Sequence, residues 1–416
     1  MQTVPKCAVR SFEDFAIWYT PGVAEVCKAI RKHPEKVFDY TNRGNTVAIV
    51  NDGTRVLGLG NIGPEAGLPV MEGKALLFKY LGGVDAFPIS LNTQNAEDII
   101  NACKWIQPSF GGINLEDIEK PKCFYILERL EKELDIPIWH DDRSGTATVA
   151  TTGLVNALKV VGKKINQVNV AMIGSGAANM TIAEMLIAAG VNPKKIVMVD
   201  SHGILSRHRE DVKNDQKKWQ ICLETNAEGR QGGAAEAIKG ADVVIAMSTP
   251  VPGTVKKEWI RTMQNNAIVF ACANPLPEIW PWDAAEAGAK IVATGRSDFP
   301  NQVNNSLGFP AIFRGVLDVR ATKITNEMCL AAAFELAKVA EDKGLSANYI
   351  IPKMDEWEVF IREAVVVGLK AMEQGVARVK RSRDELEDMS RSTIKNARDT
   401  VHALMDKKLI PPPPKD

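Results

Sequence analysis

The sequence has no pattern of paired cysteines, no excess of charge of either sign and no long hydrophobic run. Its seven cysteines are scattered, without a Cys-x-x-Cys pair, which favours free thiols in a reducing cytoplasm over structural disulfides. Lysine plus arginine and aspartate plus glutamate number 51 each, so net charge does not suggest a nucleic-acid or anionic-membrane partner. No apolar stretch reaches the roughly 20 residues that span a bilayer, and the first residues lack the apolar region of a secretory signal. We therefore expect a cytoplasmic protein without a membrane or nucleic-acid partner.

What the sequence does have is the composition of an ordinary globular chain and enough length for more than one domain. It contains 416 residues, 45% of them hydrophobic, and about two domains are expected at roughly 100–200 residues each. Alternating short helix and strand patterns over 1–148 predict an N-terminal α/β domain. The β-α-β pattern over 149–323 predicts a doubly wound parallel sheet of the Rossmann type. Residues 324–416 are predicted to be helical and to pack back on the first domain.

Five apolar runs define the predicted parallel sheet, at residues 168–173, 196–200, 243–247, 267–271 and 290–294. Runs of this kind, bounded by turns and helices, are typical of buried parallel strands. We expect them in the order 3-2-1-4-5, with a helix over 149–162 connecting the two domains. Ligands of such folds bind at the carboxyl ends of the strands, so we expect the substrate and cofactor in the cleft between the domains.

A glycine-containing turn follows the first of these runs. The backbone N–H groups of this turn, and the dipole of the helix that it opens, are expected to hold a dinucleotide pyrophosphate. Asn179 stands where such turns carry a third glycine, which serves helix–strand packing. The alternative interpretation is a glycine turn in an α/β fold that binds no nucleotide. The residues predicted to bind the cofactor here are Gly174, Ser175, Gly176, Ala177 and Ala178.

Asp200 ends the second run, where an acid is expected to accept hydrogen bonds from the ribose hydroxyls of the cofactor. This position favours NAD over NADP. NADP remains the alternative, because three basic residues that follow closely are able to reach a 2′-phosphate: Arg207, His208 and Arg209.

Two pairs of acids lie in the first predicted domain. Glu116 and Asp117 follow Gly-Gly-Ile-Asn-Leu, and Asp141 and Asp142 precede a Gly-Thr-Ala segment. Carboxylate oxygens are the ligands that Mg²⁺ and Mn²⁺ prefer, so these acids are candidate metal ligands beside a nicotinamide site. Both pairs also fit structural roles, as acids at a helix N-terminus or as partners of Lys120.

Longer segments of the sequence resemble one family. They are Tyr-Thr-Pro-Gly-Val-Ala at 19–24, Asp-Gly-Thr-Arg-Val-Leu-Gly-Leu-Gly-Asn-Ile-Gly at 52–63, Met-Glu-Gly-Lys at 71–74, Gly-Gly-Ile-Asn-Leu-Glu-Asp at 111–117, Ala-Thr-Gly-Arg-Ser-Asp at 293–298 and Asn-Asn at 304–305. From about Tyr19 to Ala332 the chain resembles the malic enzyme family, and most of all its shorter, bacterial-type members. The resemblance implies oxidative decarboxylation of L-malate to pyruvate and carbon dioxide, with NAD or NADP and with Mg²⁺ or Mn²⁺.

The resemblance also implies that the domain over 1–148 binds malate and metal and forms the contact of a homodimer or higher homo-oligomer. It further implies roles for individual residues. In the family, an acid and a base move protons, three carboxylates bind the metal, and an arginine and two asparagines contact the substrate. The matching residues are Tyr19 as general acid, Lys74 as general base and Asp141 as the partner of that lysine; Glu116, Asp117 and Asp142 for the metal; and Arg55, Asn274 and Asn305 for malate, with Asn274 also at the cofactor.

These implied roles agree with the chemistry that the reaction needs. A base must take the 2-hydroxyl proton of malate as hydride leaves C2. A lysine does this only when it is neutral, which burial and a nearby cation favour and a neighbouring carboxylate opposes. An acid must then protonate C3, and Tyr19 is able to pass its proton through Lys74. By position alone, Tyr19 would be an amphipathic aromatic beside Trp18, and Lys74 a solvated lysine on a helix.

Arg143 and Ser144 depart from the family pattern, since a glutamine is usual after the aspartate pair, and we expect the Arg143 guanidinium near the metal or the nicotinamide. Three other functions are considered. A malolactic-type reaction would form lactate without net reduction of the cofactor, an amino-acid dehydrogenase would need no metal, and a catalytically impaired protein would only bind nucleotide.

Overall fold

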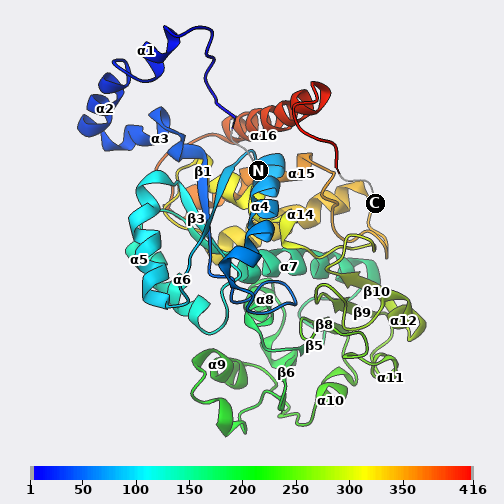
Figure 1. The fold of residues 1–416 in the computed structure, drawn as a ribbon. Coiled ribbons are helices and arrows are strands. Elements are labelled where there is room, and N and C mark those ends of the chain that lie inside the picture. Colours follow the sequence, from blue (N-terminus) through cyan, green and yellow to red (C-terminus); the bar gives the residue numbers. More distant parts are fainter. Residues whose placement is uncertain (1–3, 414–416) are drawn as a thin grey trace.

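The structure, a computed structural model, describes residues 4–413, so the first and last few residues of the predicted domains lie outside it. Two sheets organise the molecule (Figure 1). No helix of the described part is long and apolar enough to cross a membrane.

The first sheet has four parallel strands in the order β2-β1-β3-β4. Strand β1, one of its two inner strands, is buried along its whole length, as expected for a parallel strand covered on both faces. Val47 and Ile49 share a core with helix α4, whereas Ala48 and Val50 share one with helices α5 and α6. The elements are β1 (Thr46–Asn51), α4 (Gly63–Gly82), β2 (Asp85–Ser90), α5 (Ala96–Ile106), β3 (Gly112–Glu116), α6 (Lys122–Glu133) and β4 (Ile138–His140).

The second sheet has six strands in the order β10-β9-β8-β5-β6-β7, all parallel except the short edge strand β7. The predicted strands form, but the predicted order is wrong in one respect. The third run, β8, lies beside the first run, β5, and the place beyond β6 belongs to β7. The strands are β5 (Val170–Ile173), β6 (Ile196–Asp200), β7 (Gly203–Ile204), β8 (Val243–Ala246), β9 (Ala267–Ala271) and β10 (Ala289–Thr294). The helices between them are α8 (Ala177–Ala188), α9 (Gln216–Glu224), α10 (Ala234–Ile238), α11 (Lys257–Ile260) and α12 (Pro281–Glu286).

One long helix, α7 (Asp141–Val161), connects the two sheets. It begins earlier than predicted, so that Asp141 and Asp142 form its first turn. It packs against α8 and α14, and the buried Asn156 side chain donates hydrogen bonds to the carbonyls of Ala337 and Ile350 at 2.8 and 3.0 Å. The helix therefore holds the second sheet and the C-terminal helices in a fixed relation to the acids at its N-terminus.

The C-terminal helices surround α4 and α7. Helices α13 and α16 pack against α4, and α15 packs against α13, α14 and α16. These helices are α13 (Phe309–Asp318), α14 (Asn326–Lys343), α15 (Glu358–Glu373) and α16 (Arg383–Asp406), preceded by the 3₁₀ turn η6 (Asn305–Leu307).

Residues 4–36 form an N-terminal arm, which extends from the body of the molecule (Figure 1). It carries α1 (Asp14–Trp18), α2 (Val23–Lys32) and the 3₁₀ turn η1 (Pro34–Lys36). The helix that follows, α3 (Val37–Tyr40), joins the arm to the body. There Arg43, Arg320 and Arg378 place their guanidinium groups 4.7, 5.4 and 5.8 Å from the centre of the Phe38 ring.

Candidate active site

The two acid pairs predicted from separate segments meet at one edge of the first sheet. Glu116 ends β3, His140 ends the neighbouring strand β4, and Leu115 pairs with His140 in register. Asp117 and the first turn of α7 follow these strand ends directly. Asp117 has φ of 52°, a left-handed backbone conformation that is uncommon outside glycine and is often kept at functional sites.

Three carboxylates converge closely enough to share a cation. One oxygen from each of Glu116, Asp117 and Asp142 lies within 4.8 Å of the others. Glu116 and Asp117 are buried, whereas the Asp142 side chain is 38% exposed, which leaves the group open on one side. The Asp117 N–H donates to Asp142 at 3.0 Å, and the buried Asp117 Oδ2 has no hydrogen-bond partner among the described residues. An unpaired, buried carboxylate oxygen in a hard-oxygen set fits Mg²⁺ or Mn²⁺.

Burial and mutual repulsion oppose the negative charge of these acids. Burial, together with the charge of Asp142, raises the pKa of Asp117 to about 8. Burial also raises the pKa values of Glu116, Asp141 and Asp142, although Lys74 acts in the opposite direction. A divalent cation would relieve the same repulsion without protonating the acids.

Lys74 lies against this cluster from helix α4 and is buried. Its Nζ donates to Glu116 Oε1 at 2.6 Å and to Asp141 Oδ2, and it lies 4.6 Å from the centre of the Phe309 ring. Burial opposes the charge of Lys74, but Asp141 and Glu116 outweigh it and raise the pKa above its ordinary value. In the absence of a cation, the carboxylates therefore keep a proton on Lys74.

Three residues that were not predicted hold the reacting groups in place. Asn114 donates to Glu116 at 2.8 Å, and Trp139 donates to Asp141 at 3.0 Å. Both stand two residues before the acid that they contact, so the two-residue period of a strand was a signal that could have identified them. Phe309 comes from α13, and no local pattern connects it with Lys74.

The Arg143 side chain contacts helices α6 and α8. Its Nε donates to Thr181 Oγ1 at 3.3 Å, and its guanidinium lies 4.3 Å from the centre of the Phe124 ring. Arg143 lines a cavity of about 250 Å³ between α6, α7 and α8, and Glu131 and Glu184 line the same cavity.

His140, which precedes the acid pair Asp141 and Asp142, is buried. Burial together with the Arg143 charge lowers the pKa of His140 to about 3, so His140 is neutral at neutral pH.

The predicted cofactor turn forms between β5 and α8. Gly174 has φ of 100°, and a Cβ there would lie 2.6 Å from the Met247 carbonyl oxygen, so this position requires glycine. Gly176 precedes the first turn of α8, and a Cβ there would contact nothing within 4 Å. Asn179, the unexpected residue, donates from Nδ2 to the carbonyls of Ile173 and Gly174 at 3.0 and 2.9 Å. It thus closes the turn with hydrogen bonds where a third glycine would close it by packing.

The turn lies next to the acid-bearing loop of the first domain. Lys120, which follows Asp117 in that loop, donates to the Ser175 carbonyl at 3.3 Å and pairs with Asp215 at 3.2 Å. The predicted dinucleotide turn is therefore in contact with the loop that follows the predicted metal ligand Asp117.

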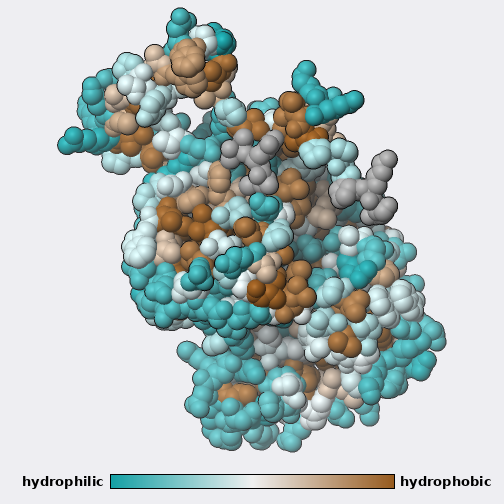
Figure 2. Space-filling model, in the orientation of Figure 1, coloured by the Kyte–Doolittle hydropathy of each residue, from teal (hydrophilic) through white to brown (hydrophobic). Residues whose placement is uncertain are grey.

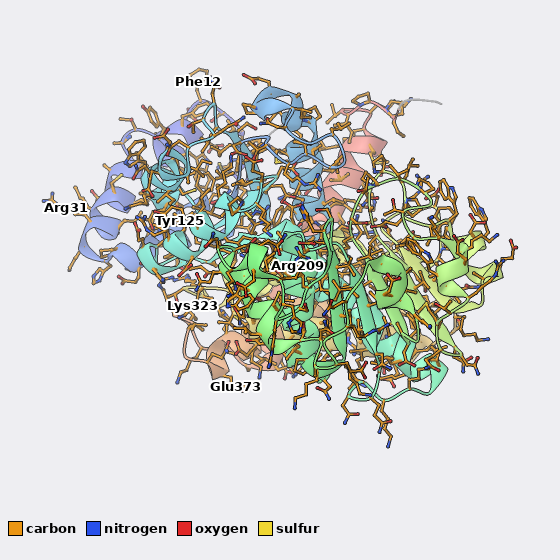
Figure 3. The ribbon with its side chains drawn as sticks, turned by 90° about the horizontal axis from the view of Figure 1, so that it is seen from below. Phe12, Arg31, Tyr125, Arg209, Lys323 and Glu373 are labelled. Carbon is orange, nitrogen blue, oxygen red and sulfur yellow. The ribbon has the colours of Figure 1, made fainter. Side chains whose placement is uncertain are left out.

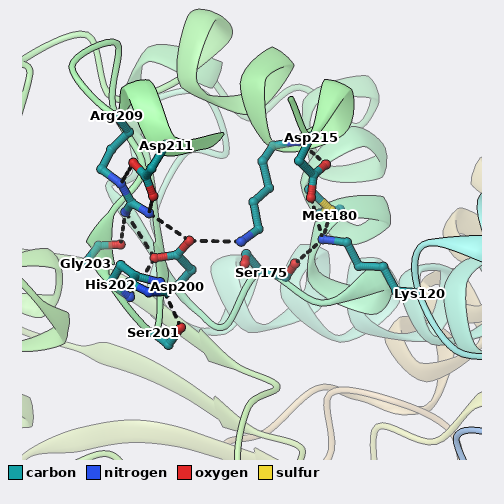
Figure 4. A network of polar contacts seen from close by, with 11 residues as sticks. Lys120, Ser175, Met180, Asp200, Ser201, His202, Gly203, Arg209, Asp211 and Asp215 are labelled. Atoms are coloured by element: carbon teal, nitrogen blue, oxygen red, sulfur yellow. Dashed lines mark hydrogen bonds and ion pairs between the residues drawn. The ribbon is translucent and has the colours of Figure 1, made fainter. Parts of the chain in front are cut away.

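Asp200 lies at the carboxyl end of β6, as predicted, but its carboxylate is already engaged (Figure 4). Arg209 donates to its two oxygens at 3.0 and 3.1 Å, and Lys218 Nζ pairs with it at 3.0 Å. Burial opposes its charge, but these two cations lower the pKa of Asp200 to about 2. Arg207 is directed elsewhere, to the Leu223 carbonyl at 2.8 Å. The acid is thus ionised but neutralised by its neighbours.

The three residues expected to contact malate lie on three different segments. Arg55 adjoins the acid cluster, because its backbone N–H donates to the Asp117 carbonyl at 3.0 Å. A Cβ on Gly145, in the second turn of α7, would lie 3.1 Å from Asn305 Cβ. The loop after β1 reaches the second domain, since a Cβ on Gly58 would lie 2.8 Å from the Asn274 carbonyl oxygen.

Tyr19, the predicted general acid, lies apart from the acid cluster of its own chain. It lies on the N-terminal arm with 71% of its surface exposed. The residues that contact Lys74 are Glu116, Asp141 and Phe309. The predicted general acid is thus absent from the predicted site of its own chain.

Comparison with known proteins agrees with this geometry over nearly the whole chain. Family models described as "Malic enzyme, N-terminal domain" and "Malic enzyme, NAD binding domain" match residues 2–131 and 144–372. The bifunctional malic/malolactic enzyme of Bacillus subtilis is 50% identical over 391 residues, 94% of each chain. The NAD-dependent malic enzyme of Geobacillus stearothermophilus is 49% identical over 380 residues, 91% of this chain and 78% of its own. The crystal structure of Entamoeba histolytica malic enzyme superimposes with a TM-score of 0.96 at 49% identity, covering 99% of this chain and 86% of that chain. The acid cluster beside a dinucleotide turn, on a fold shared along its length, shows that this chain belongs to the malic enzyme family.

Proposed function

We propose that the protein catalyses the oxidative decarboxylation of L-malate to pyruvate and carbon dioxide, with NAD, or alternatively NADP, as hydride acceptor and with Mg²⁺ or Mn²⁺. The observation that carries the proposal is the position of Lys74. It is held by Glu116 and Asp141 at the edge of three convergent carboxylates. A candidate base in contact with a candidate metal ligand supports the proposal.

Each side chain has a separate role in the proposed reaction. Hydride leaves C2 of malate while Lys74, in its neutral form, takes the 2-hydroxyl proton. The C3–C4 bond then breaks, carbon dioxide leaves, and C3 receives a proton from the Tyr19 hydroxyl, which Lys74 restores. A cation held by Glu116, Asp117 and Asp142 would polarise the 2-oxygen and offset the carboxylate field around Lys74, and a nicotinamide would accept the hydride. Arg55, Asn274 and Asn305 would orient the substrate.

The test is a cofactor-reduction assay with L-malate and Mn²⁺, run separately with NAD and NADP, in which pyruvate is measured beside the reduced cofactor. We expect equal amounts of pyruvate and reduced cofactor, and loss of both in excess chelator. Full turnover in excess chelator, or no oxidation of malate with either cofactor, would contradict the proposal.

A malolactic reaction is a second candidate, and the name of the Bacillus subtilis relative favours it. In that reaction the hydride returns to the ketone, so lactate forms and no reduced cofactor accumulates. The ratio of lactate to reduced cofactor, measured in the same assay, separates the two reactions.

A further inference from the structure

The N-terminal arm exposes apolar side chains that its own chain does not cover. Phe12 is 91% exposed, and Phe15, Ile17 and Trp18 are also exposed. Helix α2 is amphipathic, with Val23, Val26 and Ile30 at helical spacing, yet it has no buried residue. Figure 2 shows hydrophobic surface on this arm, and Figure 3, from another side, shows Phe12 and Arg31 at the margin of the molecule. An apolar surface of this kind marks a place where another surface binds.

The arm is nevertheless folded. Arg10 and Asp14 form an ion pair at 2.9 Å, the Trp18 indole donates to the Ala8 carbonyl at 3.1 Å, and the rings of Phe12 and Phe15 meet edge to face at 5.7 Å. A preformed segment of this kind loses little conformational entropy when it docks.

The body of the chain has exposed apolar surface as well. Leu68 and Leu76 lie on α4, the helix that carries Lys74, and Leu57 and Leu59 lie on the loop after β1 that carries Arg55; all four are exposed. Hydrophobic surface gathers on this face of the body in Figure 2. The chain therefore has one apolar arm and one apolar face on the elements that build the site.

The positions of the five tyrosines give a reason for the apolar arm of one chain to bind the apolar face of another. Three of the five have their own partners away from Lys74: Tyr80 with His402, Tyr125 with Glu97 and Tyr349 with Glu356. Tyr40 lies beneath Lys36, with 5.6 Å from Nζ to the ring centre. Tyr19 remains, on the arm, next to the exposed Trp18.

We infer that the arm of one protomer packs against a second copy of the chain and brings Tyr19 into the active site of that partner. Each chain has one arm that carries Tyr19 and one candidate site without a tyrosine. In a dimer with a two-fold axis, each arm therefore supplies Tyr19 to the site of the other chain. The inference rests on the proposed function for the role of Tyr19, and it adds that each active site takes residues from two protomers.

Complementation between inactive variants tests this. Tyr19→Phe and Lys74→Ala are made on chains with different tags, co-expressed, and the heterodimer is purified through both tags. If the arm is exchanged, one of its two sites contains both native residues, and we expect about half of the wild-type turnover per heterodimer. If each chain completes its own site, both sites are defective and the heterodimer is as inactive as the two homodimers, which would overturn the inference.

A matched pair serves as the control. Lys74→Ala combined with Asp142→Asn alters two residues of the body, so arm exchange predicts no recovery of turnover in that heterodimer.

Sedimentation velocity provides a second measurement that does not depend on activity. We expect a dimer for the wild type and a shift toward monomer for Ile17→Asp, and a wild type that stays monomeric would also overturn the inference. Failure of the proposed function would instead appear as a wild-type dimer that does not oxidise malate.

Discussion

Lys74 is the residue on which the proposed reaction depends most directly. Replacing it with alanine removes a candidate base that contacts both Glu116 and Asp141, so kcat on malate should fall by about 10²–10⁴-fold. Lys79 lies on the same helix but pairs with Asp85 at 2.7 Å, and Lys79→Ala should leave kcat close to that of the wild type. Steady-state kinetics of the two variants make the comparison, and equal kcat values in both would remove Lys74 from the mechanism.

Asp142 supplies the exposed side of the candidate metal site. We expect Mn²⁺ to raise the Tm of the wild type, because a ligand that binds only the folded state stabilises it. Asp142→Asn should weaken Mn²⁺ binding by at least the roughly tenfold typical of lost metal-site contacts, and it should abolish most of the Tm shift. Calorimetric titration and thermal unfolding measure both effects. Asp98→Asn, on the exposed start of α5, is the control, and an unchanged Mn²⁺ affinity in Asp142→Asn would contradict the assignment.

Asp200 is the residue that we expect to recognise the cofactor ribose. Because Arg209 and Lys218 neutralise it, we expect only a modest preference for NAD over NADP. Asp200→Ser would free Lys218 for a 2′-phosphate and leave Arg209 with Asp211 as its carboxylate partner at 2.7 Å, so the ratio of kcat/KM values should shift toward NADP by about tenfold, equivalent to roughly 1.4 kcal/mol. Arg207→Ala should leave the ratio unchanged, since Arg207 contacts Leu223. A ratio indifferent to Asp200→Ser would show that this acid does not influence cofactor choice.

At the scale of single residues, sequence reasoning was successful where a motif was short and local. The four acids stand at predicted strand and helix ends, and their meeting follows from two adjacent parallel strands ending at the same edge. The Arg209–Asp200 pair and the Phe309–Lys74 contact were not predictable, because they depend on side-chain directions and on tertiary packing between distant segments.

At the scale of elements, the runs of apolar residues identified the strands of the second sheet but not their order. A buried strand has the same pattern of apolar residues whichever strand lies beside it. A right-handed crossover can place the next strand on either side of the first. The edge strand β7 has only two residues, too few to produce a pattern. The start of α7 was placed too late because its first turn contains the polar residues of the site instead of an apolar stripe.

The link between α7 and the C-terminal helices can be tested through Asn156. Asn156→Ala leaves the buried Ala337 and Ile350 carbonyls without their donor, which should lower the free energy of unfolding by about 1–3 kcal/mol. Asn348→Ala, at an exposed position, should change it little. Urea unfolding followed by circular dichroism measures both variants, and equal midpoints would show that the two hydrogen bonds contribute nothing.

At the scale of the whole molecule, the two-sheet architecture and the family were predictable, whereas the position of the arm was not. The spacing in α2 predicts an amphipathic helix, but an amphipathic helix packs equally well on its own body or on a neighbour. Local sequence carries no signal for that choice.

The last helix contributes to the stability of the whole chain. Leu386 is buried in α16, where its Cδ1 would lie 3.2 Å from a Cβ placed on Gly368 of α15. Leu386→Ala should therefore destabilise the fold by about 2–5 kcal/mol, whereas Met405→Ala, 52% exposed on the same helix, should have little effect. Chemical denaturation of the two variants measures the difference, and similar midpoints would contradict the role assigned to α16.

The contact between α16 and α4 also has a consequence for biosynthesis. Helix α4 carries Lys74, and α16 follows it only after helices α5 to α15, while translation proceeds from the N-terminus. The packing of the helix that carries the proposed base is therefore incomplete until α16 has been synthesised. A nascent chain that stalls before α16 leaves uncovered the part of α4 on which α16 packs, and such exposed apolar surface is prone to aggregation.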